Sequence, residues 1–293
     1  MKQKIFPFRE WSFLHRAFYC FARAIVPRWP RFFFNFDIYG VENIHKLPEG
    51  VPVIFCGNHQ SHLDSILFAS AIVKPYGPRL FLAFMASGKA MVENKFFGLT
   101  HYLGAFPVFK EDPKPALSTT VKLLKHGYAV YISPQGKRVG RTPFHDFHNL
   151  VQEGRTGVGR IILKTNGKVP IVPFYLHGAY EALRSGQFLP RFKANLSIRI
   201  GKPLVFKEYT RSQRWKESDP DFFPTAREIV DKIMWSIRFL MLIEEKYYFD
   251  LVEKVTKAPL ERIPIPSYKS SFNWFLRKTT LLQRKQLQKM LET

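Results

Sequence analysis

The chain has 293 residues, with 45 lysines and arginines against 23 aspartates and glutamates, for a formal net charge of +22. This length accommodates one large α/β domain, or a domain of about 200 residues with an extension. The charge suits nucleic acid or an anionic membrane, but the aromatic residues cluster with aliphatic ones, unlike those of RNA-binding strands. We therefore expect a membrane surface with anionic lipids as a partner, and no nucleic acid.

The cysteine content excludes a disulfide framework or a zinc site made of cysteines. Cys20 and Cys56 both lie in apolar surroundings, which indicates buried thiols in a reducing compartment. The first 30 residues lack the order of a signal peptide, because Arg16 and Arg23 interrupt the apolar run. Since no stretch reaches about 18 uninterrupted apolar residues, we expect no spanning helix. The sequence thus predicts a peripheral or monotopic protein on the cytoplasmic face of a membrane.

The N-terminal 35 residues carry an amphipathic pattern. Between Trp11 and Val26 apolar side chains recur at helical spacing with basic residues between them, and Pro27 ends the pattern. An interfacial helix and a helix packed on the core both fit this pattern. Residues 28–34 then alternate arginine with aromatic residues, which suits the headgroup zone of a membrane. We assign residues 1–35 to an N-terminal membrane-interfacial segment.

Residues 36–206 have the alternating elements of an α/β fold, and we expect a mixed, largely parallel sheet flanked by helices. Strands are predicted at 36–41, 51–56, 128–132, 169–176 and 196–200, and 80–85 forms a further strand or a short helix. Helices are predicted at 65–73, between Asp112 and Gly127, and around 158–162. Together with the N-terminal amphipathic helix, these elements predict one domain built around a sheet.

Residues 207–293 are predicted to form a C-terminal helical extension. A charged linker at 211–221 precedes a long helix that starts near Pro224. Its buried face is expected to carry Ile229, Ile233, Ile237 and Leu240. The last segment, 274–291, mixes leucines with basic residues, a pattern that fits either a membrane-surface helix or a solvated one.

A polar segment at 58–64 follows an apolar strand and precedes a predicted helix. Its His59 and Asp64 can form a general-base dyad, in which the aspartate fixes the tautomer and stabilises the imidazolium. On a helix, residues five apart point about 140° away from each other, so His59 should lie in the loop before the helix. Ser61 and Asp64 also fit a capping box, which is a purely structural alternative for the aspartate.

Four segments in order resemble the motifs of the glycerolipid acyltransferase family of the 1-acylglycerol-3-phosphate acyltransferase type. Residues 58–64 match its Asn-His-x4-Asp block, and 104–110 match a second block that ends in a basic residue, usually arginine but here Lys110. Residues 134–138 stand where the family has Pro-Glu-Gly-Thr-Arg, and 169–173 match the proline-bearing fourth block. The resemblance covers residues 36–206.

This resemblance implies a membrane-associated O-acyltransferase. Such an enzyme moves a fatty acyl group from acyl-CoA or acyl carrier protein to a hydroxyl of a lysophospholipid, such as 1-acylglycerol-3-phosphate, and needs no further cofactor. His59 would deprotonate the hydroxyl and Asp64 would orient the ring. Lys110 and Arg138 would hold the acceptor's phosphate, with Gln135 and Gly136 as further substrate-binding residues. The chain has no Gly-x-Ser-x-Gly nucleophile elbow, which agrees with direct attack on the thioester.

The third block departs from the family pattern. Gln135 replaces a glutamate, so it keeps the polar shape but cannot act as a base or an ion-pair partner. The departure leaves two alternatives open: a catalytically silent lipid-binding or membrane-scaffolding protein of the same fold, or an acyltransferase with a non-glycerophosphate acceptor.

Further histidines are expected to have lesser roles. His145, Asp146 and His148 lack another well-spaced ligand, so we expect no metal site. His62 is expected to support the site or lie at the surface, not to act as a second base.

Overall fold

The computed structural model describes residues 12–47, 51–76, 81–93, 99–138, 151–183, 187 and 189–256, and it places a seven-stranded sheet at their centre. The strands are β1 (Asn35–Tyr39), β2 (Val53–Gly57), β3 (Leu82–Ser87), β4 (Ala105–Val108), β5 (Ala129–Ile132), β6 (Ile171–His177) and β7 (Asn195–Ile200). Their spatial order is β1-β7-β6-β2-β5-β3-β4. The pairs from β6 to β4 are all parallel, whereas β7 runs antiparallel to β6 and parallel to β1. The predicted α/β fold with a mixed, largely parallel sheet is thus confirmed.

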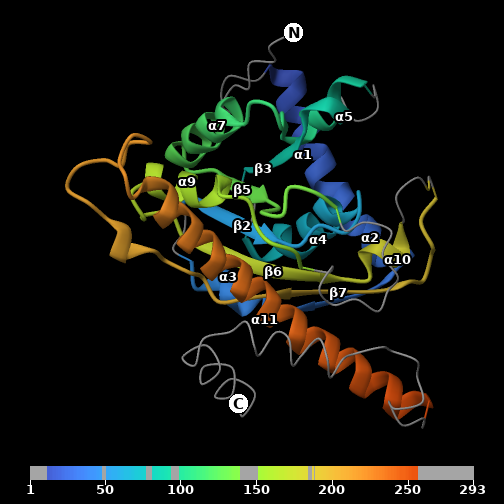
Figure 1. Cartoon of the computed structure of the whole chain (residues 1–293). Coiled ribbons are helices and arrows are strands. Elements are labelled where there is room, and N and C mark those ends of the chain that lie inside the picture. The colour runs from blue at the N-terminus through green and yellow to red at the C-terminus, as the bar shows by residue number, and fades with distance from the viewer. Residues whose placement is uncertain are drawn as a thin grey trace.

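Helices cover both faces of this sheet (Figure 1). The helices are α1 (Phe13–Ile25), α2 (Trp29–Phe33), α3 (Glu42–His45), α4 (Asp64–Tyr76), α5 (Gly88–Glu93), α7 (Lys114–Lys125), α9 (Gly157–Lys164), α10 (Ala179–Ala182) and α11 (Phe222–Thr256). Short 3-10 helices are η2 (Val26–Arg28), η3 (Leu99–Leu103) and η4 (Lys207–Tyr209). Successive strand side chains point to opposite faces, so Phe55 packs under α4 while Ile54 and Cys56 pack under α7, α9 and α11.

The predicted long helix is α11, and it belongs to the core of the sheet domain. It starts at Phe222, with Pro224 in its first turn, where the missing N–H of proline leaves no bond unmade. Ile229, Ile233 and Ile237 are fully buried, and they share a hydrophobic cluster with residues of β2, β5 and β6. The part of α11 from Phe222 to Met241 therefore covers one face of the sheet. The segment 274–291 lies outside the described residues.

The N-terminal helix α1 packs on the protein through a narrow face. Tyr19 and Ala22 are buried, and the Tyr19 hydroxyl accepts the Leu82 N–H at 3.0 Å and donates to the Leu82 carbonyl at 3.3 Å. Large apolar side chains on the outward face are exposed: Phe13, Leu14, Phe18, Phe21 and Ile25. Among the described helices, none combines the length and apolar character that a bilayer span requires.

The prediction that both thiols are buried is wrong for one of them. Cys20 is exposed, because it follows Tyr19 on the helix and lies outside the narrow buried face of α1. Cys56 is buried within β2, and this burial raises the pKa of its thiol. An apolar neighbourhood in the sequence does not reveal which face of a helix meets the core.

Candidate active site

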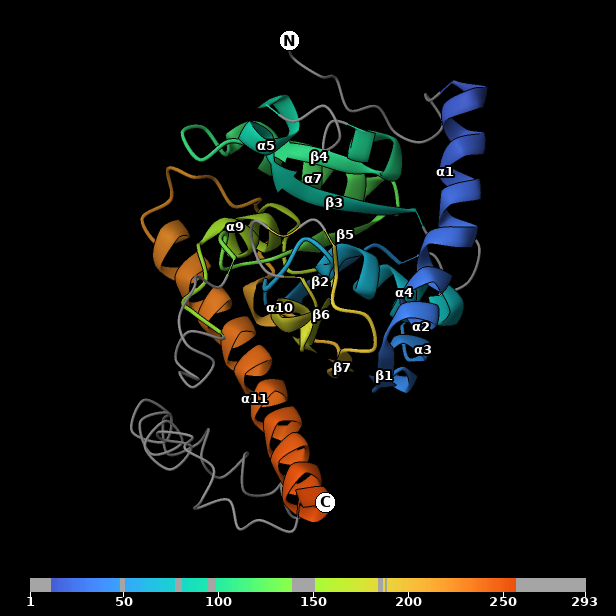
Figure 2. The ribbon, with the colours of Figure 1, turned by 90° about the vertical axis from the view of Figure 1, so that its right-hand side faces the viewer.

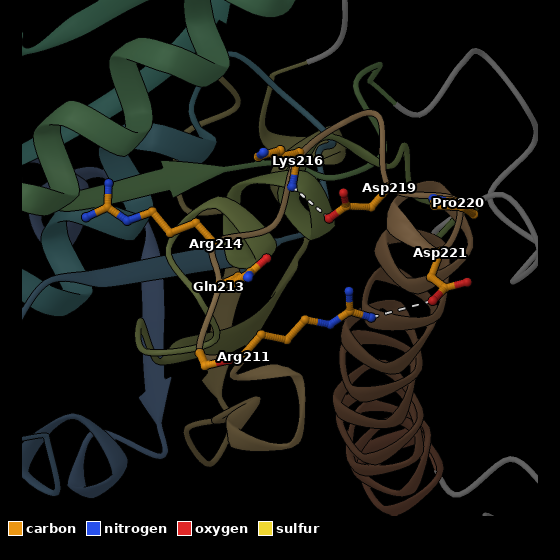
Figure 3. Close-up of a pocket in the computed structure, with 8 residues that line it drawn as sticks. Arg211, Gln213, Arg214, Lys216, Asp219, Pro220 and Asp221 are labelled. Carbon is orange, nitrogen blue, oxygen red and sulfur yellow. Dashed lines mark hydrogen bonds and ion pairs between the residues drawn. The ribbon is translucent and has the colours of Figure 1, made fainter.

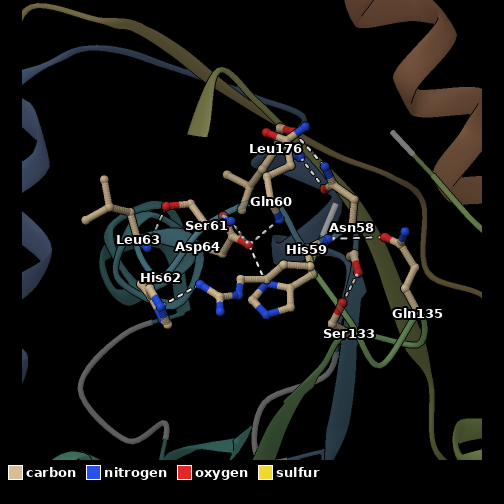
Figure 4. A network of polar contacts seen from close by, with 12 residues as sticks. Asn58, His59, Gln60, Ser61, His62, Leu63, Asp64, Ser133, Gln135 and Leu176 are labelled. Carbon is tan, nitrogen blue, oxygen red and sulfur yellow. Dashed lines mark hydrogen bonds and ion pairs between the residues drawn. The ribbon is translucent and has the colours of Figure 1, made fainter. Parts of the chain in front are cut away.

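The polar segments of the first and third motifs meet at the carboxyl edge of the sheet (Figure 4). Residues 58–63 leave the end of β2, and residues 133–138 leave the end of the adjacent parallel strand β5. Ligands of open α/β sheets bind beyond the carboxyl ends of such strands. The topology thus brings residues 76 positions apart into one place.

His59 and Asp64 are in direct contact. The Nδ1 atom of His59 lies 2.6 Å from Oδ2 of Asp64, which is the first residue of α4. The His59 side chain is 30% exposed and the Asp64 side chain 2%. His59 lies in the loop before the helix, as helix geometry requires of a pair five residues apart.

The main chain of the same loop holds the Asp64 carboxylate. Its Oδ2 accepts the Gln60 N–H at 2.7 Å, and both oxygens accept the Ser61 N–H at 3.0 and 3.1 Å. The bond from the Ser61 N–H to the Asp64 carboxylate is the carboxylate half of a capping box, while the Ser61 hydroxyl accepts the Leu63 N–H at 3.2 Å. The capping alternative and the dyad are therefore both realised by one carboxylate, which fixes the loop and the ring together.

These contacts assign the tautomer of His59. An ionised carboxylate only accepts hydrogen bonds, so the hydrogen must reside on Nδ1 of His59. The Nε2 atom then carries the lone pair, on the ring of a partly exposed side chain. Such an imidazole can take a proton from a hydroxyl while the aspartate stabilises the resulting charge.

The loop after β2 and the loop after β5 keep the pairing register of these two strands. In the β2–β5 pair Val53 lies opposite Ala129 and Cys56 opposite Ile132. Beyond the strand ends, three side-chain contacts keep the same spacing of 76 residues between the two loops. They join Ser133 to Gly57, Gln135 to His59 and Arg138 to His62. We call these three contacts the loop ladder. It fixes the third-motif residues relative to His59.

Gln135, from the third motif, makes the middle contact of the loop ladder. Its Oε1 accepts the His59 N–H at 3.2 Å, and the side chain is only 2% exposed. Its Nε2 is buried without a hydrogen-bond partner among the described residues. The amide therefore bonds directly to the main chain of His59, a contact that could not be predicted from the sequence. The next residue, Gly136, turns the chain at φ +66°, where a side chain would be strained.

The outer contact of the loop ladder joins two basic side chains. Nη1 of Arg138 lies 2.5 Å from Nε2 of His62. An arginine has only donors, so this ring nitrogen of His62 accepts and is unprotonated. The pKa of His62 is lowered, chiefly by burial and then by the charges of Arg138 and His59, while Asp64 acts in the opposite direction.

Lys110 lies at the same edge but away from the dyad. It follows β4, which is separated from β2 by β5 and β3, so the two strands are roughly 14 Å apart at ordinary strand spacing. Its side chain is exposed. The fold therefore brings His59, Asp64, Gln135, Gly136 and Arg138 together and leaves Lys110 at the periphery.

Asn58 and Ser61 support the loop in ways that the sequence analysis did not identify. The Asn58 amide donates to the Leu176 carbonyl and accepts the Leu176 N–H, both at 2.8 Å, which extends the pairing of β2 with β6 by a side chain. The Ser61 hydroxyl donates to the Leu183 carbonyl at 2.9 Å. The role of Asn58 could have been predicted from the sequence, since an amide side chain directly after a buried strand can replace main-chain hydrogen bonds.

The fourth motif lies at the opposite, amino edge of the sheet. The Pro170 carbonyl accepts the Ile54 N–H at 3.0 Å just before β6 begins, so this motif shapes the central strand pair. The same edge has a surface hollow of about 500 Å³ (Figure 3), lined by Arg211, Ser212, Gln213, Arg214, Lys216, Asp219, Pro220 and Asp221. Arg211 pairs there with Asp221 at 3.5 Å and lies over the ring of Trp215.

The sequence offered three possible metal ligands. His145, Asp146 and His148 lie outside the described residues. Within the part of the chain that the structure describes, no group of three His, Cys, Asp or Glu side chains could hold a metal ion.

The sequence was compared with protein families and with curated proteins, and it matches acyltransferases. A family model described as "Acyltransferase" matches residues 38–177. The chain is 30% identical over 166 residues to a 1-acyl-sn-glycerol-3-phosphate acyltransferase of Bacillus subtilis (strain 168), covering 56% of this chain and 72% of that protein. It is 25% identical over 222 residues to tafazzin of Drosophila melanogaster, covering 71% of this chain and 54% of that protein.

A solved structure has the same fold. The crystal structure of the 1-acyl-sn-glycerophosphate (LPA) acyltransferase, PlsC, from Thermotoga maritima superposes with a TM-score of 0.55 at 19% sequence identity. The match covers 81% of this chain and 85% of that one. The likeness therefore extends beyond the four motifs to most of the chain.

Proposed function

We propose that this chain, which belongs to the glycerolipid acyltransferase family of the 1-acylglycerol-3-phosphate acyltransferase type, transfers a fatty acyl group from an acyl thioester to a hydroxyl of a lysophospholipid. The observation that carries this proposal is the contact of 2.6 Å between His59 Nδ1 and Asp64 Oδ2, at the edge of the sheet where substrates bind. The acyl donor is acyl-CoA or acyl carrier protein.

In this mechanism His59 acts as a general base and then as an acid. Its Nε2 takes the proton of the acceptor hydroxyl while the oxygen attacks the thioester carbonyl. The carbon–sulfur bond breaks, the imidazolium returns the proton to the leaving thiolate, and the ester and free thiol result. Asp64 stabilises the imidazolium, and general-base catalysis of this kind contributes about 10² to 10⁴ in rate. No acyl-enzyme forms.

Arg138 and Lys110 are proposed to bind the phosphate of the acceptor. Arg138 is tied to the loop of His59 through His62, so a phosphate on its guanidinium would lie near the base. Arginine binds phosphate bidentately, whereas lysine acts as a point charge, which suits Lys110 to a peripheral and less directional contact. The name of the Bacillus relative, a 1-acyl-sn-glycerol-3-phosphate acyltransferase, supports such an acceptor. Gln135 and Gly136 shape this part of the site.

A membrane is proposed to dock on the outward face of α1 and on α2. Phe13 is 76% exposed and Phe32 is 83% exposed, although both are large apolar side chains. Figure 2 shows α1 along the outer side of the molecule, next to α2 and α4. Arg28 and Arg31 are exposed in the same N-terminal segment and suit anionic headgroups on the cytoplasmic side of a membrane.

The test is an acyl-transfer assay on anionic vesicles with a panel of acceptors. Purified protein receives labelled acyl-CoA or acyl carrier protein together with 1-acylglycerol-3-phosphate, lysophosphatidylcholine or monoacylglycerol. We expect loss of thioester matched by new ester, fastest with the phosphomonoester. Absence of thioester loss with every acceptor would leave the lipid-binding scaffold as the better account. Transfer to the phosphate-free acceptor alone would instead indicate a non-glycerophosphate acceptor.

A further inference from the structure

We propose that His62 is a positioning residue of the acceptor site, whose neutral ring holds the Arg138 guanidinium ready for the acceptor's phosphate. The inference rests on the proposed function, in which Arg138 binds that phosphate. It assigns to His62 a role that differs from the base role of His59, although the two histidines are three residues apart in one loop.

The geometry of the loop ladder carries this inference. Arg138 follows the turn at Gly136, and its side chain has only donors to offer. Nε2 of His62 accepts from Nη1 of Arg138 at 2.5 Å. A guanidinium held in one place before the ligand arrives loses less conformational entropy on binding than a freely rotating one. The ring of His62 therefore preorganises the phosphate-binding group.

The same contact ties the phosphate-binding group to the base. His62 and His59 share the loop that the Asp64 carboxylate fixes through the N–H groups of Gln60 and Ser61. Arg138 and Gln135 share the facing loop, and Gln135 accepts the His59 N–H. The loop ladder thus sets the span between phosphate and base, which determines which hydroxyl of the acceptor meets Nε2 of His59.

The hydrogen bond from Arg138 to His62 depends on the protonation state of the His62 ring. A protonated ring would turn an N–H toward the N–H of Arg138, so the contact exists only while the ring is neutral. The charged and titratable groups that act on this ring in the described part of the chain are Arg138, His59 and Asp64. Partial burial and then the Arg138 guanidinium lower the pKa of His62, which keeps the ring neutral to a lower pH than an unperturbed histidine. Below that pKa, Arg138 is released.

Two variants of His62 separate the hydrogen bond from the shape of the ring. His62→Phe keeps a ring without an acceptor, and His62→Gln keeps an acceptor that does not titrate. At pH 8 we expect His62→Phe to raise KM for the phosphate-bearing acceptor about tenfold, the effect of losing a hydrogen bond to a charged group, with kcat within about threefold. His62→Gln should stay within about threefold of wild type in both. In an Arg138→Ala background, His62→Phe should change nothing further.

The pH dependence gives a second readout. As pH falls through the lowered pKa of His62, KM for the wild type should rise relative to KM for His62→Gln, and this ratio cancels the titration of the acceptor's own phosphate. Nitrogen NMR of the ring should show a neutral His62 at pH 7, and Arg138→Ala should raise the pKa of His62 by removing the neighbouring charge. This spectroscopic measurement does not depend on activity.

The outcomes distinguish this inference from the proposed function. If wild type transfers acyl groups but His62→Phe leaves KM unchanged, or costs the same tenfold without Arg138, the inference is overturned and the function stands. If wild type transfers nothing to any acceptor, the proposed function fails, while the response of the His62 pKa to Arg138→Ala still confirms or refutes the contact between the two side chains.

Discussion

The two edges of the sheet both carry clustered polar side chains, but they use them differently. At the amino edge, the side chains around the hollow pair mainly with one another and with their own segment, as Arg211 does with Asp221 and Trp215. At the carboxyl edge, Asn58 and Gln135 bond to main-chain groups of neighbouring segments, and the buried Asp64 carboxylate bonds to the main chain of its own loop. The ring of His59 remains partly exposed.

This difference is the reason we place the site at the carboxyl edge and not at the hollow of the amino edge. Ion pairs between exposed side chains contribute little energy and impose little geometry. Buried carboxylate and amide groups bonded to the main chain fix a loop, because leaving any of them unpaired would be costly. The carboxyl edge is therefore the preorganised one.

The largest expected effect follows from changing the carboxylate at the carboxyl edge. Asp64→Asn removes the charge that stabilises the imidazolium and can turn an N–H toward Nδ1 of His59. We expect the rate of acyl transfer to fall by about 10³ to 10⁴. We also expect the free energy of unfolding to fall by about 1–3 kcal/mol, because the N–H groups of Gln60 and Ser61 lose a charged acceptor. Steady-state kinetics and urea unfolding measure the two effects. A change in unfolding alone would reduce Asp64 to a helix cap.

The outward face of α1 gives the next largest effect. Replacing Phe18 and Phe21 by serine removes two exposed rings, each worth up to about 2 kcal/mol when buried in lipid. We expect binding to anionic vesicles to fall roughly 10- to 100-fold in a flotation assay, with the melting temperature unchanged. Phe223→Ser, which removes an exposed ring at the start of α11, is the matched control and should bind like wild type. Equal losses in both variants would argue against a docking face on α1.

The variant Ser61→Ala distinguishes the contribution of the loop after β2 to stability from its contribution to catalysis. The variant loses the hydrogen bonds to the Leu63 N–H and the Leu183 carbonyl but keeps the contact of His59 with Asp64. The free energy of unfolding should fall by about 1 kcal/mol, while kcat stays within about threefold of wild type. A loss of activity as large as that of Asp64→Asn would mean that the capping interaction alone governs the site.

The smallest effect is expected at the amino edge. Arg211→Ala breaks the exposed pair with Asp221 and the contact with Trp215, and should lower the free energy of unfolding by less than about 1 kcal/mol. Because the hollow lies at the other end of the strands, transfer should stay within about twofold of wild type, measured with the same acceptor. A large rise in KM for the acyl donor would show that the hollow takes part in binding it.

The sequence predicted the elements and the dyad better than their contacts. Periodicity located six of the seven strands but not β4, and the five-residue spacing placed His59 in the loop before α4. The loop ladder could not be predicted, because it depends on β5 lying next to β2, and a sequence does not give the order of strands. For the same reason the distance of Lys110 from the dyad was not apparent, and the role of His62 in holding Arg138 was missed.

The central claim is that His59 removes the proton of the acceptor hydroxyl, and the most direct test is single-turnover acyl transfer by His59→Ala on anionic vesicles. The side chain is partly exposed and its main-chain N–H is retained, so we expect the melting temperature and vesicle binding of wild type. Transfer should fall at least about 10³-fold. Transfer at the wild-type rate by a folded, membrane-bound His59→Ala protein would contradict the account.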